Sequence, residues 1–537
     1  MPLPKPTDEY TPVTYNSLSS NIAHDGGILM LANNDPGLSS LIPAILKSID
    51  HTIATDLSSE VTTANGKAMI DMIRRLVRWS IAEIEQHQSL YATRSALECQ
   101  LFADTSASFA TAEPAVGGLY AAPTGSERRY FGEVDALATR LKRDMANAHA
   151  QPAARAALAG RLRRVLEAEV RFHAALDPES ASDIASAYHG GKSDKSQDVL
   201  PQTPAVTADT LNAYLRRRFP DVAAIAAGNL QMLTGGMGKD TILFELSGHP
   251  TFSGPLVMRK DLPVLCLDVS AVDEFPLLKA VHAAGVQVPE PLWAEGDPEQ
   301  LGSRFIVVRR ARGSVAIAQE IPDDAIRRHF ADKLAEGLVA IHRVSLPELE
   351  VFRTASGKSL SACLREQLDS WRDFWVRKRL EPSLKLELIF AWLEANIPPD
   401  SGLAPTLVHG DYGFHNLIME KGEITAILDW EFAHMGDPAE DVNYCRQFIE
   451  RYVPFDYFLE RYLTRGGRPY DAARDRFFTV WRNVRNAVAS IGALNAFQRK
   501  TPGNIKMATA GLAYNPRFEL EALRLVTDYI EGGGPSP

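Results

Sequence analysis

Apolar residues recur at steps of three and four along the first third of the chain. Between residues 66 and 90 they form two adjacent stripes, and the same spacing returns in residues 134–145 and 158–176. A period near 3.6 residues is typical of helices that bury one broad face. We therefore expect residues 1–177 to form an all-α helical bundle, an accessory domain.

A polar segment follows this helical pattern. Residues 178–206 are rich in Ser, Asp, Gly, Lys and Pro without periodic apolar residues, which indicates a linker. A linker of this kind implies few contacts across the domain boundary. Gly191-Lys192-Ser193 match the end of a phosphate-binding P-loop, but Ser186 stands where that motif requires glycine. A P-loop is therefore not expected.

The pattern changes again from residue 207 onward. Short strand-like apolar runs come first, at residues 242–246, 256–259 and 305–309, and longer helical segments follow. This order predicts an α+β fold with a small β-rich N-lobe, residues 207–312, and a larger helical C-lobe, residues 313–537. The cleft between two such lobes is the expected place for a site.

Composition narrows the class of protein. The chain has 537 residues and a formal net charge of −10, which disfavours nucleic acid or an anionic membrane as its partner. Its four cysteines lack the spacing of a zinc site or a disulfide framework. No apolar run approaches the roughly 20 residues that span a bilayer, and the first ten residues lack a signal-peptide core. We expect a cytoplasmic protein with no nucleic-acid or membrane partner.

Residues 407–441 carry the strongest chemical signal. Asp411 and Asn416 stand five positions apart, and Asp429 follows an apolar run at residues 425–428. Phosphoryl transfer needs one carboxylate beside the incoming hydroxyl, and a second carboxylate with an amide oxygen to hold Mg²⁺. The spacing therefore predicts Asp411 as the catalytic residue, with Asn416 and Asp429 as metal ligands.

These residues resemble the signatures of the aminoglycoside phosphotransferase and choline kinase-like family. The His-Gly-Asp-x-x-x-x-Asn signature is matched by His409, Gly410, Asp411 and Asn416. The second signature is matched by Asp429, Gly436-Asp437-Pro438 and Asp441. Trp430-Glu431 after Asp429, in place of Phe-Gly, is similar to the branch of kinase-like domains fused to acyl-CoA dehydrogenases.

The resemblance covers residues 207–500 and implies a two-lobed, protein-kinase-like fold. It also implies ATP and Mg²⁺ as cofactors and transfer of the γ-phosphoryl group to a hydroxyl of a small molecule. The branch suggests a hydroxyacyl-CoA or a similar hydroxylated metabolite as acceptor, whereas the wider family adds aminoglycosides, macrolides, choline and homoserine. The N-terminal helical domain could then form a homodimer, cover the cleft or bind a carrier.

A glycine-rich hairpin precedes these motifs in the order that a kinase requires. Gly235, Gly236 and Gly238 lie between two strand-like runs, where backbone N–H groups can approach phosphates. The alternative is an ordinary turn.

The next strand offers a phosphate-binding cation. Side chains alternate along residues 256–260, so Val257 and Arg259 share one face while Lys260 points to the other. We expect Val257 to contact adenine and Arg259 to contact phosphate, with Lys260 as the open alternative. Glu274, in the first turn of the following helix, is the candidate acid that orients this cation. The alternative is a solvent-exposed glutamate that favours the helix dipole.

Residues 304–309 predict the strand that leads into the hinge between the lobes. Backbone groups at Val308 and Arg310 are then expected to contact adenine, although the run also fits an ordinary edge strand. His342 lies in an apolar helical stretch and is expected to be a core residue with satisfied hydrogen bonds.

Two other functions fit parts of the pattern. An inactive kinase-like protein that binds a nucleotide or another ligand is one, because Arg259 replaces the usual lysine. A metal-dependent phosphoesterase is the other, because His409, Asp411 and His415 lie in one loop with Asn416. Six residues on later helices are candidates for the acceptor pocket or for the core: Trp371, Phe374, Trp375, Trp481, Arg482 and Arg485.

Overall fold

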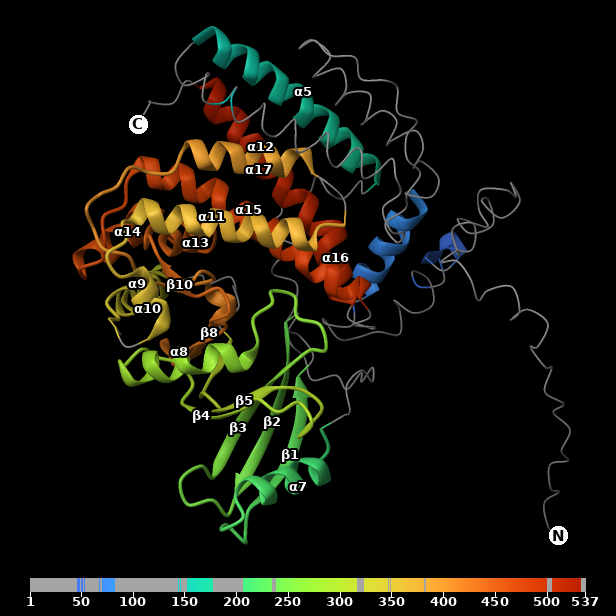
Figure 1. Cartoon of the computed structure of the whole chain (residues 1–537), viewed down its shortest axis with the longest axis vertical. Coiled ribbons are helices and arrows are strands. Elements are labelled where there is room, and N and C mark those ends of the chain that lie inside the picture. The colour runs from blue at the N-terminus through green and yellow to red at the C-terminus, as the bar shows by residue number, and fades with distance from the viewer. Residues whose placement is uncertain are drawn as a thin grey trace, which may run out of the picture.

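The computed structural model describes two lobes and, before them in the chain, a helical segment at residues 70–82 and the helix α5 at Pro152–Leu176 (Figure 1). The described residues are 46–48, 50–51, 53, 67, 70–82, 143, 145, 152–176, 206–233, 238–315, 323–345, 347, 349–380, 383–499 and 505–532. Gly235, Gly236 and most of the predicted helical domain lie outside these ranges. The division of the chain into three domains and a linker therefore stays a prediction.

The N-lobe is built on a five-stranded antiparallel sheet in the order β1-β2-β3-β5-β4. Its elements are α7 (Ala208–Arg218), β1 (Ala226–Leu233), β2 (Lys239–Ser247), β3 (Gly254–Asp261), α8 (Ala271–Ala283), β4 (Pro291–Glu295) and β5 (Phe305–Arg309). Leu256 and Met258 are fully buried in a core with α7. Val257 packs instead into the core that contains α8. The alternation predicted along β3 is confirmed.

The C-lobe is mostly helical and encloses two small sheets. Its helices are α9 (Asp324–His342), α10 (Glu350–Ala355), α11 (Leu360–Lys378), α12 (Leu384–Ala395), α13 (Ala439–Ile449), α14 (Phe455–Thr464), α15 (Ala472–Gln498), α16 (Ile505–Thr509) and α17 (Asn515–Glu531). Its strands are β6 (Ser314–Val315), β7 (Thr406–Val408), β8 (Leu417–Glu420), β9 (Glu423–Ile427) and β10 (His434–Gly436). The strands pair as β6-β8-β9 and β7-β10, and the loops that follow β7 and β9 carry the predicted site. The predicted α+β, two-lobed architecture is confirmed.

One shared core holds the lobes together below these loops. It combines Ile306 and Val308 of the N-lobe with Leu407 and Ile427 of the C-lobe. Leu407 precedes the Asp411 loop and Ile427 precedes Asp429. Because both apolar residues are fixed in this core, the start of each loop has a fixed position.

Helix α5 (Pro152–Leu176) packs on the C-lobe beside α17 (Figure 1). Leu158, Leu162 and Val165 belong to the same core as α12, α15 and α17. Glu169 and Lys385 form an ion pair of 2.5 Å in which each side chain is only 3% exposed. The expectation of few contacts between residues 1–177 and the lobes is therefore wrong for this helix, because its apolar face is part of the C-lobe core.

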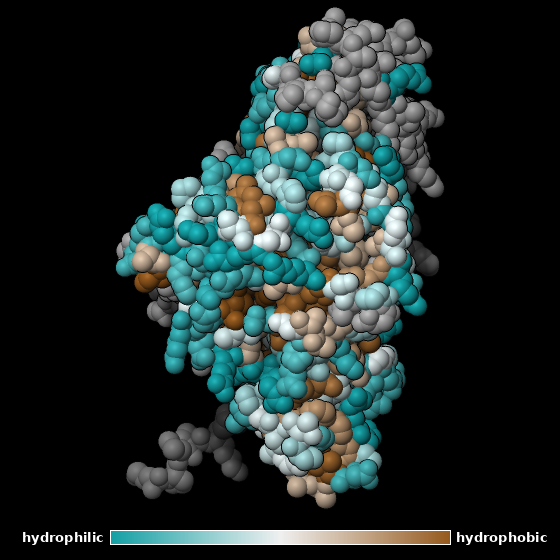
Figure 2. All heavy atoms as spheres, turned by 90° about the vertical axis from the view of Figure 1, so that its left-hand side faces the viewer, coloured by the Kyte–Doolittle hydropathy of each residue, from teal (hydrophilic) through white to brown (hydrophobic). Residues whose placement is uncertain are grey.

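The surface of the molecule is mainly hydrophilic on the side shown in Figure 2, where apolar side chains form small patches among polar ones. None of the helices within the described ranges combines the length and apolarity that a membrane crossing requires.

Candidate active site

Asp411 lies in a loop that one buried carboxylate anchors. The backbone N–H groups of His409 and Gly410 both donate to Asp441, each at 2.8 Å, and Asp441 is fully buried. Gly410 has a φ of 82°, and a Cβ at this position would lie 2.8 Å from the Phe432 carbonyl oxygen. Only glycine therefore fits here without strain. Asp441 of the second signature therefore anchors the loop that carries the first signature.

His342 supports this anchor from α9. Its Nε2 lies 3.2 Å from Asp441 Oδ2, and its Nδ1 lies 2.8 Å from the Tyr462 hydroxyl. The side chain is buried and both ring nitrogens have partners. The prediction that His342 is a satisfied core residue is confirmed.

His409 joins the Asp411 loop to the segment that carries Asp429. Its Nδ1 accepts from the Asp411 N–H at 3.2 Å, and its Nε2 donates to the Leu428 carbonyl at 3.0 Å. Burial lowers the pKa of His409, although nearby carboxylates oppose this change. The ring is therefore neutral, and its two hydrogen bonds define the tautomer.

Asp411 presents an ionised carboxylate at the end of this loop. Its Oδ2 accepts from Asn416 Nδ2 at 2.7 Å and lies 3.3 Å from His415 Nε2. Burial would raise the pKa of Asp411, but the charge and hydrogen bond of His415, with contributions from Tyr444 and Arg485, lower it to about 2. Asp411 can therefore accept or orient a proton throughout the neutral range.

Asn416 and Asp429 lie on neighbouring segments. Asn416 Nδ2 also donates to the Asp411 carbonyl at 3.0 Å, which leaves Oδ1 as the oxygen for other partners. The Leu428 N–H donates to the Asn416 carbonyl at 2.8 Å, so Asp429 follows a residue that is bonded directly to Asn416. Asp429 has a left-handed φ of 65°, and its side chain is 32% exposed. This turn directs the carboxylate toward the N-lobe.

The donor set suits Mg²⁺, since one carboxylate and one amide oxygen are hard ligands that leave room for phosphate oxygens. Within the described ranges, no group of three or more His, Cys, Asp and Glu side chains is arranged to hold a metal ion.

Arg259 reaches the Asp429 turn from β3. Its guanidinium donates to Asp429 Oδ1 at 3.0 Å. Lys260 is only 1% exposed on the opposite face, and burial lowers the pKa of its ammonium group. Of the two cations that the sequence left open, Arg259 lies on the side of the sheet that faces Asp429.

Glu274 has a different partner from the one expected. Its Oε1 forms an ion pair of 2.6 Å with Lys239 Nζ, whereas the charge of Arg259 acts on the pKa of Glu274 as a weaker influence. Lys239 also donates to Glu431 Oε2 at 2.8 Å. Neither Lys239 nor the contact made by Glu431 was predicted from the sequence. The available signals were that Lys239 directly follows the glycine-rich turn and that Glu431 replaces the glycine of the Phe-Gly pair.

The hinge strand β5 is not an edge strand, because it pairs with β3 on one side and β4 on the other. Val308 pairs with Val257, so both lie on one face of the sheet. The N–H of Arg310 donates to the Pro255 carbonyl at 3.0 Å. Any adenine contact at Arg310 must therefore use a group other than this N–H.

The six candidates for the acceptor pocket are mainly core residues. Trp375 and Trp481 are at most 1% exposed, and Arg485 forms a buried ion pair of 2.7 Å with Glu440. Trp371 differs because it is only partly buried and stacks on Phe432 with 5.8 Å between ring centroids. Phe432 in turn packs against Gly410, and Arg485 Nη1 also lies close to this glycine, so both side chains reach the Asp411 loop.

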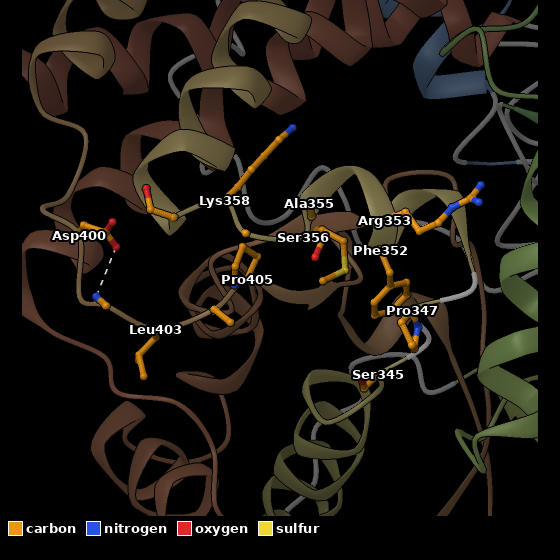
Figure 3. Close-up of a pocket in the computed structure, with 15 residues that line it drawn as sticks. Ser345, Pro347, Phe352, Arg353, Ala355, Ser356, Lys358, Asp400, Leu403 and Pro405 are labelled. Atoms are coloured by element: carbon orange, nitrogen blue, oxygen red, sulfur yellow. Dashed lines mark hydrogen bonds between the residues drawn. The ribbon is translucent and has the colours of Figure 1, made fainter.

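A separate cavity of about 780 Å³ lies between α10, the start of α11 and the segment before β7 (Figure 3). Phe352, Lys358, Pro405 and Met435 are among its lining residues. None of the residues predicted for the site lines it. Lys358 is paired with Glu366 at 2.7 Å.

The two lobes, with the Asp411 loop and the Asp429 turn between them, form a protein-kinase-like fold. Residues 231–478 match the profile of the Phosphotransferase enzyme family, APH.

Curated relatives confirm the resemblance to both groups named above. Acyl-CoA dehydrogenase family member 11 of Gallus gallus is 28% identical over 244 residues, which cover 44% of this chain and 30% of the relative. Acyl-CoA dehydrogenase family member 10 of Mus musculus is 27% identical over 299 residues, 54% of this chain and 26% of the relative. Hygromycin-B 4-O-kinase of Escherichia coli is 24% identical over 255 residues, 44% of this chain and 66% of that protein. The match thus spans about a third or less of the acyl-CoA dehydrogenase relatives.

Solved structures with similar folds include macrolide 2'-phosphotransferase MphH of Brachybacterium faecium. It is 21% identical with a TM-score of 0.37, covering 57% of this chain and 98% of that one. A thermostable mutant of aminoglycoside phosphotransferase APH(4)-Ia, in ternary complex with ADP and hygromycin B, is 16% identical with a TM-score of 0.39. That match covers 61% of this chain and 100% of the other.

Proposed function

We propose that the two lobes transfer the γ-phosphoryl group of ATP to a hydroxyl group of a small molecule. The observation that supports this most is the contact of 2.7 Å between Asn416 Nδ2 and Asp411 Oδ2, beside the turn that presents Asp429. It combines an ionised carboxylate for the acceptor hydroxyl with a nearby amide oxygen and a second carboxylate. Phosphoryl transfer requires these groups together.

In this proposal each residue has one task. Asp411 accepts or orients the proton of the acceptor hydroxyl, and Asn416 and Asp429 hold Mg²⁺. The metal, when bound, neutralises charge on the phosphates. Arg259 contacts the phosphates, and Glu274 supports the site through Lys239. Val257, Val308 and Arg310 form the adenine side, and Gly235, Gly236 and Gly238 supply backbone N–H groups to the phosphates.

The acceptor is a hydroxylated metabolite in this proposal, and a hydroxyacyl-CoA is the first compound class to test. The relatives that support this choice are members of the acyl-CoA dehydrogenase family. Hygromycin-B 4-O-kinase supports the alternative of a sugar-containing antibiotic. A cytoplasmic location and a homodimer formed through the N-terminal helical domain remain part of the proposal.

The test measures ADP release from Mg-ATP, and from Mg-GTP in parallel, with 3-hydroxyacyl-CoA, hygromycin B and choline as acceptors. Turnover of one acceptor by the wild type that falls by about 10²–10⁴ in Asp411→Asn supports the proposal. The matched control is Asp456→Asn, which changes an exposed aspartate in the first turn of α14.

Two results would redirect the assignment. Mg-ATP binding in a thermal shift assay, without turnover of any acceptor, would favour a nucleotide-binding module. Metal-dependent hydrolysis of phosphate esters without nucleotide binding would favour the phosphoesterase.

A further inference from the structure

Two contacts join the N-lobe to the segment that follows β9. Arg259 donates to Asp429 at 3.0 Å, and Lys239 donates to Glu431 at 2.8 Å. Trp430, between the two acids, is 2% exposed and donates its indole N–H to the Ile427 carbonyl. The two acids therefore face the N-lobe together while Trp430 anchors their segment in the core.

Lys239 lies at the centre of this arrangement. Its side chain is 2% exposed, and its ammonium group contacts Glu274 Oε1 at 2.6 Å as well as Glu431. Burial would lower the pKa of Lys239, but the surrounding carboxylates raise it above its usual value. Lys239 is thus a buried cation that contacts acids from both lobes.

The glycine before Lys239 matches this geometry. A Cβ added to Gly238 would lie 3.2 Å from Glu431 Oε2. A side chain there would push against the carboxylate that holds Lys239. Gly238 therefore allows the exit of the glycine-rich turn to approach Glu431, in addition to any approach of its backbone to phosphate.

We propose that Lys239 is a positioning residue of the nucleotide site, which ties the exit of the glycine-rich turn to α8 through Glu274 and to the Asp429 segment through Glu431. The inference rests on the proposed function and extends it to the contacts that Lys239 makes with Glu274 and Glu431. In this proposal Glu431 holds Lys239 from the C-lobe side. With Lys239 in place, the start of β2 is held beside the segment that carries the Asp429 carboxylate.

The charges around Lys239 indicate how strongly its loss would change the affinity for Mg-ADP. Among the described residues, Glu274 and Glu431 both contact Lys239, and Asp429 contacts Arg259. Loss of Lys239 leaves Glu274 and Glu431 without this cation beside the proposed phosphate site, and it removes the contacts that join the start of β2 to both acids. We expect the affinity for Mg-ADP to fall by about tenfold to a hundredfold, while adenosine, which lacks phosphates, binds as before.

The test uses the full chain and isothermal titration calorimetry with Mg-ADP and with adenosine. The variants are Lys239→Met, Lys239→Arg, Glu431→Gln and the double variant Lys239→Met/Glu431→Gln. Lys279→Met, an exposed lysine on the same helix as Glu274, is the control. We expect Lys239→Arg to keep most of the affinity, because a guanidinium can donate to both acids. The double variant should lose less than the sum of the two single losses.

Three outcomes separate the possibilities. Absence of Mg-ADP binding by the wild type would overturn the proposed function itself. Wild-type affinity in a folded Lys239→Met, or additive losses in the double variant, would overturn only the role of Lys239. If Lys239→Met does not fold, the test relies on Lys239→Arg and Glu431→Gln. An affinity for Mg-ADP in folded Glu431→Gln that equals the wild-type value would contradict the inference.

Discussion

Asn416 donates its amide nitrogen to the carboxylate of Asp411, with 2.7 Å between Nδ2 and Oδ2. Because the same nitrogen also donates to the Asp411 carbonyl, Asn416 is oriented and its Oδ1 is left for other partners. One side chain thus holds the proposed base and offers a metal ligand. The interval of five residues between Asp411 and Asn416 allows the two side chains to form this hydrogen bond.

Asn416→Asp tests this double task. The change keeps an oxygen for Mg²⁺ but places a second carboxylate beside Asp411, so like charges raise the pKa of the pair. One of the two carboxylates then holds a proton nearer neutral pH. We expect turnover to fall by about 10² or more and Mg-ADP affinity to change much less. Steady-state kinetics and calorimetry on the same preparation measure both, and an equal loss in the two would contradict the shared role.

Asp429→Ala tests the metal assignment. The side chain is 32% exposed, so its removal opens no core cavity and folding should be retained. Turnover of Mg-ATP should be lost because the charged metal ligand is missing. ADP production near the wild-type rate, with an unchanged circular dichroism spectrum, would show that the metal is held elsewhere.

The order of the lobes and the catalytic loop could be predicted because each depends on local patterns. Strand alternation placed Val257 and Arg259 on one face of β3, and fixed spacing paired Asp411 with Asn416. These relationships need only a few neighbouring residues in a regular conformation.

The partner of Glu274 could not be predicted in the same way. Lys239 and Glu274 are on different elements, and Glu431 comes from the other lobe, so their meeting depends on how the lobes pack. Helix α5 was misjudged for a similar reason. Its apolar stripe predicted a helix but contained no information about which core would cover that stripe.

Asp441→Asn tests the anchor of the Asp411 loop. The fully buried carboxylate accepts from His409 and Gly410 and contacts His342, and an amide can replace only part of this acceptor capacity. We expect the free energy of unfolding to fall by about 3–5 kcal/mol, as when one partner of a buried charge network is removed. Urea unfolding measures it, with Asp456→Asn as the exposed control. A loss below about 0.5 kcal/mol would mean that the loop is held by other contacts.

A fragment that begins near residue 200 tests the role of α5. Its deletion uncovers the C-lobe core where Leu158, Leu162 and Val165 pack, and it removes Glu169 from Lys385. Each lost apolar side chain contributes about 1.5–3 kcal/mol. We expect the fragment to aggregate or to unfold at a lower temperature than the full chain. Equal melting temperatures in a thermal shift assay would show that α5 adds no stability.

The neutral imidazole of His409 predicts a pH dependence of stability. Burial holds the pKa of His409 below its ordinary value of 6.5, so below pH 6.5 the unfolded chain takes up a proton that the native state does not. Stability then rises with pH in this window and is lost as the pH falls. His415 and His434 have raised pKa values, because neighbouring carboxylates outweigh their burial, and they act in the opposite direction. Their contributions cancel when the wild type is compared with His409→Gln.

The comparison uses urea unfolding of both proteins at several values between pH 7.5 and pH 5.5, a range of about one unit on either side of the ordinary histidine pKa. His409→Gln should be less stable at the upper end, because the link between the Asp411 N–H and the Leu428 carbonyl is weakened. The advantage of the wild type should shrink below pH 6.5 by up to about 1.4 kcal/mol per pH unit. A constant difference across the range would mean that His409 takes up a proton as readily in the native state as in the unfolded chain. In that case a neutral ring does not join the two loops.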